Sequence, residues 1–425
     1  MQKLLEEIVS SENMNKAYKQ VMKNKGSHGV DEMTLDELSS YLNENKENII
    51  NQIKERKYKP QPVRRVEIPK ENGGVRELGI PTVVDRVIQQ SIVQVLSPIF
   101  DKEFHDNSYG FRAKKNAEMA IVKTLDYIND GYEWIVDIDL ERFFDTVHHD
   151  RLMNIFSRTI KDGDVVSLVR KYLVSGVMID DEYKESIIGT PQGGNLSPLL
   201  SNIMLNELDE ELEKRGLKFV RYADDCIIFV KSEMSARRVM RSVSKFIEEK
   251  LGLIVNVRKS RVIKPTDKEM KFLGFGYYYD TFNKLVKAKP HNISVESFKY
   301  KLKQLSKRSW SVNMRYRISK INQLIRGWIN YFRIGKMKNK LKAITSNLRF
   351  RLRMCIWKQW KTFEKRTKAL IKLGMKTWNA YKNARSSKSY AAIASSGIMQ
   401  STVTNEKLTQ KGLVSPLEYY NKVHI

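Results

Sequence analysis

The chain has 425 residues, of which 41% are hydrophobic and 29% charged, so it can build more than one domain and does not have the composition of a disordered protein. No apolar run approaches the roughly 18 residues that cross a bilayer, and the N-terminal segment carries acids where a signal peptide would be apolar. The two cysteines, Cys226 and Cys355, stand far apart, and the six histidines form no metal-binding spacing. We therefore expect an intracellular protein that has no disulfide framework, no zinc site and no membrane span.

The net charge of +27 is concentrated toward the C-terminal end. Residues 281–425 contain 33 Lys and Arg but 4 Asp and Glu, a net charge of +29, whereas the other 280 residues have a net charge of −2. Such a dense positive charge repels itself unless a polyanion neutralises it. A membrane-surface helix is the alternative, but tryptophans interleave the bases and no clean apolar stripe is present. The pattern favours a nucleic acid as the partner.

In chain order, residues 1–57 have helical patterns that are interrupted by a turn around Gly26 and Gly29. Residues 62–69 alternate in polarity and predict a strand. The ENGG sequence at 71–74 is typical of a hairpin turn, and the VREL sequence after it predicts the returning strand.

Apolar residues three and four positions apart predict a helix over 82–104, and a second helix is expected over 116–129. The short apolar run at 133–139 predicts a buried strand. The segment 197–214 predicts a helix with an acidic outer face.

The segment 219–230 predicts a β-hairpin, followed by a helix over 235–251 and strands within 270–287. From about residue 292 onward the pattern is helical and basic. Pro290 is a plausible domain boundary, because the composition changes sharply there.

The tip of the hairpin at 219–230 is acidic. Asp224 and Asp225 lie there between two apolar strands, where adjacent acids are costly unless something binds them, although Asp also favours ordinary turns. Asp139 ends the apolar strand at 133–139. If that strand lies beside the hairpin, three carboxylates meet and repel one another unless divalent cations neutralise them. Oxygen ligands of this kind suit Mg²⁺, and a pair of such ions is the usual device for phosphoryl transfer.

Seven ordered motifs resemble those of reverse transcriptases encoded by group II introns, which are also maturases. The matching stretches are VRELGIPT (75–82), SYGFR (108–112), VDIDLERFFDTVHHD (136–150), GTPQGGNLSPLLSN (189–202), VRYADD (220–225), LGLIVNVRKS (251–260) and FLGF (272–275). A further stretch, LIRGWINYFR (324–333), resembles the maturase or thumb segment. The resemblance covers roughly residues 1–370.

The resemblance implies an α+β fold of the right-hand polymerase type, with an antiparallel palm sheet, a helical thumb and a small helical C-terminal domain. The expected domains are a helical extension at 1–58, fingers and palm at 59–285, a thumb or maturase domain at 286–365 and a DNA-binding segment at 366–425.

The resemblance also implies site residues. The metal ligands, for two Mg²⁺ ions that Mn²⁺ can replace, would be Asp139, Asp224 and Asp225. Asp137, two residues before Asp139 on the same strand, is the alternative ligand. Phe144 resembles the gate that collides with a ribose 2′-hydroxyl and so selects dNTPs, the alternative being a core aromatic.

In the fingers, Lys70 and Arg76 flank the ENGG turn and resemble residues that grip the triphosphate, and Arg64 is expected to join them. A solvated hairpin is the alternative. Gln192, in a glycine-rich loop, resembles a residue that contacts the incoming nucleotide or its template partner. Lys259 resembles a lysine near the active site.

The basic C-terminal region is then expected to hold the template–primer duplex and the structured intron RNA. The residues expected to contact nucleic acid are Arg326, Trp328, Tyr331, Arg333, Arg351 and Arg353. The sequence has no Cys/His cluster like that of the family's zinc-containing endonuclease domain. We therefore expect an endonuclease-lacking, group IIC-like member.

The expected activity is RNA-directed DNA synthesis, in which a primer 3′-hydroxyl is extended with dNTPs on an RNA template. The expected partners are the intron RNA, whose splicing it would assist, and a target DNA for retrohoming, in the cytoplasm or nucleoid of a bacterial cell. One alternative is a splicing-only maturase without polymerase activity. Another is a reverse transcriptase of the retron, diversity-generating or CRISPR-linked type.

Overall fold

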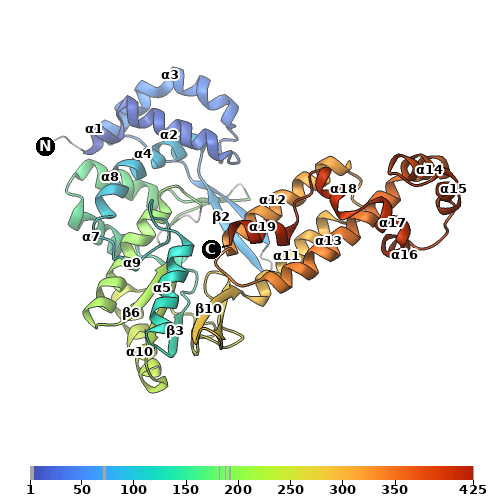
Figure 1. The fold of residues 1–425 in the computed structure, drawn as a ribbon. Helices are drawn as coiled ribbons and strands as arrows, with labels where there is room; N and C mark the ends of the chain where they lie inside the picture. Colours follow the sequence, from blue (N-terminus) through green and yellow to red (C-terminus); the bar gives the residue numbers. More distant parts are fainter. Residues whose placement is uncertain (1–3, 70–72, 181, 187, 191–192, 425) are drawn as a thin grey trace. The chain divides into compact units, whose positions relative to one another are not determined.

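The structure is a computed structural model that describes residues 4–69, 73–180, 182–186, 188–190 and 193–424. It forms two compact units, of which the first ends at Lys264 and the second begins at Pro265 (Figure 1). The first unit mixes helices with two four-stranded sheets, whereas the second begins with a β-hairpin and continues as helices.

The N-terminal segment is helical, as the sequence predicts. Its helices are α1 (Leu4–Ile8), α2 (Ser11–Asn24) and α3 (Leu35–Lys54). Helix α3 begins with a capping box, in which the Thr34 N–H donates to the Glu37 carboxylate over 2.8 Å. Helix α2 packs against α4 (Val83–Phe100), so the extension joins the core of the first unit.

One sheet has the strand order β2-β1-β4-β5. Its strands are β1 (Val63–Pro69), β2 (Val75–Ile80), β4 (Val177–Ile179) and β5 (Glu182–Lys184). Strands β1 and β2 form the predicted antiparallel hairpin. The three-residue strand β4, which the sequence did not predict, pairs with β1 in parallel through Val63 and Val177.

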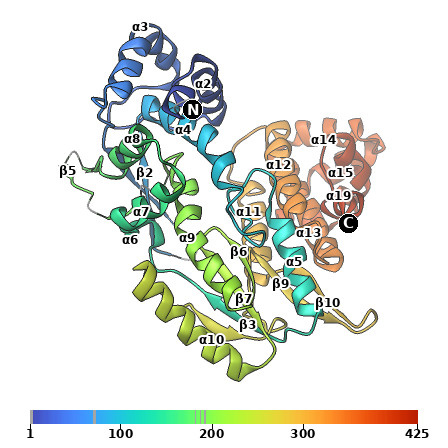
Figure 2. The ribbon, with the colours of Figure 1, turned by 90° about the vertical axis from the view of Figure 1, so that its left-hand side faces the viewer.

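The second sheet has the order β6-β7-β3-β8, and all its pairings are antiparallel. Its strands are β3 (Trp134–Ile138), β6 (Lys218–Tyr222), β7 (Asp225–Val230) and β8 (Arg261–Ile263). Helices α5 (Ala117–Asn129) and α9 (Ser197–Lys214) pack against β6, and α10 (Glu233–Phe246) packs against β3, β7 and β8 (Figure 2). The central strands β3 and β7 lie side by side because their apolar runs are buried among these helices.

The predicted helices of this unit are present. The helix predicted over 197–214 has the predicted bounds, and the others have shifted ends. The segment predicted over 235–251 is α10 followed by a π-helical turn, η1 (Ile247–Leu251). The remaining helices are α6 (Phe143–Thr146), α7 (His149–Thr159) and α8 (Gly163–Leu173).

The second unit begins with a hairpin of β9 (Phe275–Asp280) and β10 (Leu285–Pro290), followed by three long helices. These are α11 (Asn292–Leu305), α12 (Met314–Phe332) and α13 (Lys338–Gln359). Six short helices follow: α14 (Phe363–Lys372), α15 (Thr377–Ala384), α16 (Tyr390–Ser395), α17 (Gly397–Thr402), α18 (Asn405–Gln410) and α19 (Pro416–Val423). The last of them, α19, returns to pack against α12 and α13.

The fold is α+β with an antiparallel central sheet and a helical C-terminal region, as the sequence predicts. The compact units divide at 264/265, whereas the sequence placed the end of the palm at 285, so the β9–β10 hairpin falls in the second unit. Within the described ranges, no helix combines the length and the apolar character needed to cross a membrane.

Candidate active site

The hairpin β6–β7 presents its acids on a tight two-residue turn. Tyr222 pairs with Asp225 across the hairpin, which leaves Ala223 and Asp224 at the tip. Ala223 has a φ of 58°, in the left-handed region that L-residues seldom adopt. Asp225 is exposed and Asp224 is half-buried, so both carboxylates are available beside a buried strand.

A fully buried arginine, Arg221, holds this turn by hydrogen bonds. The Arg221 guanidinium donates from Nε to Asp209 Oδ1 over 2.7 Å and from an Nη to the Ala223 carbonyl over 2.9 Å. It also donates to Asn202 Oδ1 over 3.0 Å. The ion pair with Asp209 has no exposed side-chain surface on either partner, so neither charge is screened by water. The strained residue Ala223 is therefore held through its carbonyl by a fixed donor.

The SYGFR segment at 108–112 packs against the same turn. The Tyr109 N–H donates to the Arg221 carbonyl over 2.8 Å, and the Arg221 N–H donates to the Asn107 carbonyl over 2.9 Å. A Cβ on Gly110 would lie 2.2 Å from the Ala223 nitrogen, so only glycine fits there. The sequence alone indicates no role for this motif. Its contacts show that it packs against the turn and holds the backbone of the turn in place.

Asp139 follows β3 directly, and the loop 256–260 holds its backbone. Its N–H donates to Ser260 Oγ over 3.1 Å, and its carbonyl accepts from the Asn256 N–H over 2.8 Å. Its Oδ1 lies 3.4 Å from Lys259 Nζ. The structure thus places Lys259 beside a predicted metal ligand.

One cavity of about 560 Å³ brings the predicted groups together. Its lining includes Asp139, Asp224, Asp225, Phe144, Arg76 and Lys259. Burial raises the pKa of Asp224, and the nearby charge of Asp139 raises it further. A cation bound between these carboxylates would relieve both effects.

The oxygen donors of this cavity fit a hard divalent cation. The described residues contain no His, Cys, Asp or Glu group of three already gathered at ligand distances. The three aspartates nevertheless line one cavity, and the charge of Asp139 adds to the burial that raises the pKa of Asp224. Carboxylate ligands without a soft donor suit Mg²⁺ or Mn²⁺.

Asp137 is separated from this group. It pairs across β3–β8 with Arg261, whose Nε lies 3.3 Å from Asp137 Oδ2, and it does not line the cavity. Burial raises the pKa of Asp137, and the Arg261 charge partly offsets this. The arrangement favours Asp139 over Asp137 as the ligand.

Helix α6 carries two adjacent aromatic residues, Phe143 and Phe144, which differ in burial. Both Phe143 and Phe144 line the cavity, but Phe143 is buried in the core and Phe144 is half-buried. Their rings meet edge-on with 5.2 Å between the centroids. The Phe144 carbonyl accepts from the Thr190 N–H over 2.6 Å. Gly189, with a φ of +94°, lies so close that an added Cβ would be 3.0 Å from the same carbonyl. The glycine-rich loop therefore packs against the predicted gate.

The residues expected to bind the triphosphate differ in whether they line the cavity. Arg76 lines the cavity. The Arg64 guanidinium instead donates to Ser27 Oγ over 3.1 Å and to the His28 carbonyl over 2.9 Å, and Arg64 does not line the cavity. Lys70 and Gln192 lie outside the described residues.

Comparison with known proteins bears on this site. The family profile described as reverse transcriptase (RNA-dependent DNA polymerase) matches residues 68–277, and the group II intron maturase-specific domain matches residues 295–386. Protein YkfC of Escherichia coli (strain K12) is 32% identical over 302 residues, which cover 62% of this chain and 79% of that protein. The chain belongs to the group II intron reverse transcriptase/maturase family.

Within this family, the group II intron-encoded protein LtrA of Lactococcus lactis subsp. cremoris is 34% identical over 277 residues. The match covers 63% of this chain but 45% of LtrA, so this chain spans less than half the length of that relative. Among solved structures, telomerase from Candida albicans in complex with a telomeric RNA fragment aligns with a TM-score of 0.45 and 15% identity. That alignment covers 88% of this chain and 68% of the telomerase chain.

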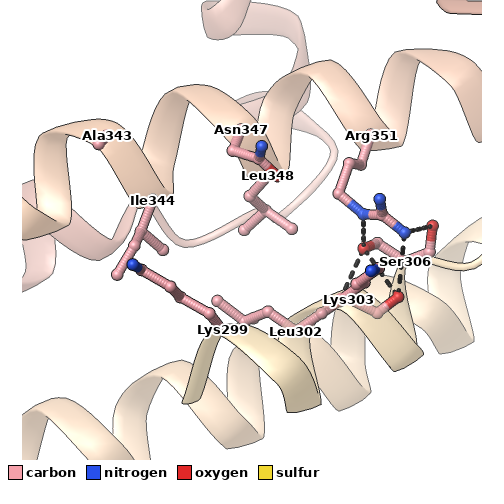
Figure 3. Close-up of a pocket in the computed structure, with 9 residues that line it drawn as sticks. All are labelled: Lys299, Leu302, Lys303, Ser306, Ala343, Ile344, Asn347, Leu348 and Arg351. Atoms are coloured by element: carbon pink, nitrogen blue, oxygen red, sulfur yellow. Dashed lines mark hydrogen bonds between the residues drawn. The ribbon is translucent and has the colours of Figure 1, made fainter. Parts of the chain in front are cut away.

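The residues expected to contact nucleic acid lie in the maturase-specific region of this family member, but several have structural partners. Trp328 stacks on Phe298 with 4.3 Å between ring centroids. Arg353 is buried and donates from Nε to the Val403 carbonyl over 2.9 Å. Arg351 donates to Ser306 Oγ over 2.7 Å (Figure 3). These three side chains therefore make packing or hydrogen-bond contacts within the helical second unit.

The other three expected contacts have different surroundings. Arg326 is exposed on α12. Tyr331 is 44% exposed and donates from its hydroxyl to the Leu273 carbonyl over 3.0 Å. Arg333 is half-buried at the end of α12.

Sequence reasoning missed two groups in this reverse transcriptase unit. The buried pair of Arg221 and Asp209 was not singled out, although a charged residue inside an apolar strand, as in FVRYA, is a usable signal. Arg142 was also missed. It lines the cavity with a φ of 48° and pairs with Asp145 over 3.0 Å.

Proposed function

We propose that this protein is an RNA-directed DNA polymerase that extends a primer 3′-hydroxyl with dNTPs on an RNA template. The observation that carries the proposal is the single cavity in which Asp139, Asp224 and Asp225 meet Arg76 and Phe144. Membership of the reverse transcriptase family supports it. The reaction joins the 3′-oxygen to the α-phosphate of the dNTP and releases pyrophosphate.

The three aspartates would hold the divalent ions, Mg²⁺ or Mn²⁺. Bound there, such ions would lower the pKa of the 3′-hydroxyl and neutralise the charge that develops on the phosphate oxygens. Arg76 would bind the triphosphate of the incoming nucleotide. Lys259, 3.4 Å from the Asp139 carboxylate, would lie beside the reacting groups as a further positive charge.

Phe144 would exclude ribonucleotides. Its ring lines the cavity, and the Thr190 N–H and the core-packed Phe143 fix the position of α6. A fixed ring leaves no room for a 2′-hydroxyl, because α6 cannot retreat into the close-packed core. Lys70 and Gln192 remain proposed nucleotide contacts on the strength of the family resemblance.

The basic second unit would bind the intron RNA and so assist splicing and retrohoming into a target DNA. The match to the maturase-specific domain and the net charge of +29 over residues 281–425 support this part of the proposal. Phosphate contacts from Lys and Arg give affinity without reading the base sequence.

A primer-extension assay with Asp224→Asn tests the proposed function. We expect synthesis to fall to about a hundredth or less, because losing one group that stabilises developing charge costs about 10²–10³ in rate. RNA binding should remain within about twofold of wild type, since its phosphate contacts come from other residues.

Normal extension by Asp224→Asn would refute the assignment. Wild-type protein that binds RNA but extends no primer would identify a splicing-only maturase instead.

A further inference from the structure

A groove of about 490 Å³ runs between α11 and α13 in the second unit (Figure 3). Its apolar floor includes Leu302, Ile344 and Leu348. Its polar lining includes Lys299, Lys303 and Arg351, with Lys299 and Arg351 toward opposite ends in the view of Figure 3. An apolar floor with cationic edges suits a ligand that has both flat apolar faces and negative charges.

The positive lining continues past Arg351. A second cavity of about 520 Å³ shares Arg351 and adds Lys307, Arg308 and Lys358. It also contains Tyr390, and the Arg308 guanidinium lies 4.6 Å from the centre of that ring. The two cavities thus form one basic groove with an aromatic side chain at one end.

The spacing of the lysines follows the helix. Lys299 and Lys303 are four residues apart on α11, which places them on one side of the helix about 6 Å apart along its axis. That interval is similar to the distance between successive phosphates of an extended nucleic-acid strand. Lys307 follows just beyond the end of the helix and lines the second cavity. Arg351 is already ordered by bonds to Ser306 Oγ, at 2.7 Å, and to the Lys303 carbonyl, at 3.1 Å. Pre-ordering of this kind lowers the entropic cost of binding.

The described residues that line this groove contribute no acidic side chain to offset its lysines and arginines. On the other side of α13, Arg349 pairs with Glu418 over 3.2 Å and Arg353 donates to the Val403 carbonyl, so the C-terminal segment covers that side. The exposed Glu296 pairs with Lys299 over 2.7 Å but lies outside the lining, and exposed pairs of this kind contribute little.

We infer that this groove, defined by Lys299, Lys303, Lys307, Arg351 and Lys358, binds a single strand of RNA. The phosphates would follow the row of cations, and unpaired bases and sugars would pack on the apolar floor and on Tyr390. A duplex hides its base faces and could contact only the rim. The residues from Lys299 to Lys358 lie within the match to the maturase-specific domain. The inference rests on the proposed function in taking RNA as the polyanion.

The test compares two charge-matched double variants of the full chain. Lys299→Gln with Lys303→Gln removes two charges from the groove. Lys301→Gln with Lys338→Gln removes two exposed charges from the same helices, α11 and α13, outside both cavity linings. Binding of a fluorescent, unstructured RNA is measured by anisotropy across a salt series without metal or dNTPs. A missing polymerase activity therefore cannot alter the result.

We expect the groove variant to lose affinity on the order of tenfold and its log–log salt slope to shrink by about 1.4, since each phosphate contact on a single strand contributes about 0.7. The outside variant should stay within twofold of wild type, and all the substituted side chains are exposed, so both should melt like wild type. Equal losses of RNA affinity in the two variants would overturn the proposal that RNA binds in this groove. Duplex RNA bound as tightly as the unstructured strand, or polyglutamate competing as well as RNA, would overturn a single RNA strand as its occupant.

Discussion

The Arg221 guanidinium is fully buried and donates both to the Asp209 carboxylate and to the Ala223 carbonyl, one residue before Asp224. A buried ion pair of this kind seldom makes the fold more stable than apolar residues of the same size would. Removing one partner is nevertheless destabilising, because it leaves the other charge buried without a partner. The bond to Ala223 gives this pair a second consequence, because it fixes the backbone that carries the proposed metal-binding carboxylates, Asp224 and Asp225.

Two variants separate these consequences. Arg221→Met alone should lower the free energy of unfolding by about 3–5 kcal/mol, because it leaves Asp209 charged and buried. Arg221→Met combined with Asp209→Leu should recover most of that loss in a denaturant titration. If Arg221 positions the turn, the double variant should still have a reduced kcat for nucleotide addition with a nearly unchanged KM for dNTP. Full recovery of kcat would show that Arg221 acts on stability alone.

Phe144 and its neighbour Phe143 make a matched pair for the gate. Phe144→Ala should increase incorporation of ribonucleotides relative to deoxyribonucleotides, because it would open the cavity at the proposed position of the nucleotide sugar. Phe143→Ala should instead cost about 3–5 kcal/mol of stability through a core cavity and should change sugar selectivity less than Phe144→Ala does. Competition between dNTP and rNTP at one template position measures this. Unchanged discrimination between dNTP and rNTP in Phe144→Ala would show that Phe144 is not the gate.

At the scale of elements, helix α4 is fixed by a buried carboxylate at its first turn. Asp85 accepts from the Tyr58 hydroxyl over 2.7 Å, from the Tyr172 hydroxyl over 3.1 Å and from the Thr82 hydroxyl over 2.8 Å. The Gln61 N–H donates to the same carboxylate over 3.1 Å. These bonds join the start of α4 to α8 and to the segment that leads into β1.

Asp85→Ala should therefore destabilise the first unit by about 3 kcal/mol, since several buried donors lose their acceptor at once. A thermal or denaturant titration of the full chain measures this. The matched control is Asp36→Ala in the first turn of α3, which is remote from any such network and should change stability by less than about 0.5 kcal/mol. Equal effects of the two substitutions would show that the network around Asp85 has no special weight.

The elements also show which features a sequence can predict. The β1–β2 hairpin was predictable because ENGG separates two alternating runs, and so was the β6–β7 hairpin with its acidic tip. Strand β4 was not, because three residues carry no periodicity and its parallel pairing with β1 depends on the tertiary fold. In the site, the resemblance implied Asp139 as the ligand and left Asp137 as the alternative, but the ion pair of Asp137 with Arg261 could not be foreseen. Arg353 looked like a surface base because sequence cannot show that the chain near Val403 folds back over it.

For the whole molecule, charge and chemistry are divided along the chain. The acidic cavity belongs to the first unit, and the excess of positive charge lies in residues 281–425, within the second. Phosphate binding by Lys and Arg needs no metal, whereas the proposed synthesis does.

Chelation should therefore separate the two activities. Adding excess EDTA should abolish primer extension and leave the affinity for unstructured RNA within about twofold, because the proposed RNA contacts are direct ion pairs with phosphates. Restoring Mg²⁺ or Mn²⁺ should recover synthesis. RNA binding that disappears with the metal would show that the second unit does not bind RNA independently of the metal.

The most direct test of the polymerase site compares Asp139→Asn with Asp137→Asn in single-nucleotide extension of a primer on an RNA template. The two residues lie two positions apart, at the end of β3, but only Asp139 lines the cavity with Asp224 and Asp225. We predict that Asp139→Asn reduces addition to about a hundredth or less, as expected for loss of a charge-stabilising group, and that Asp137→Asn retains most of it. Full activity in Asp139→Asn, or loss of activity in Asp137→Asn alone, would contradict the account.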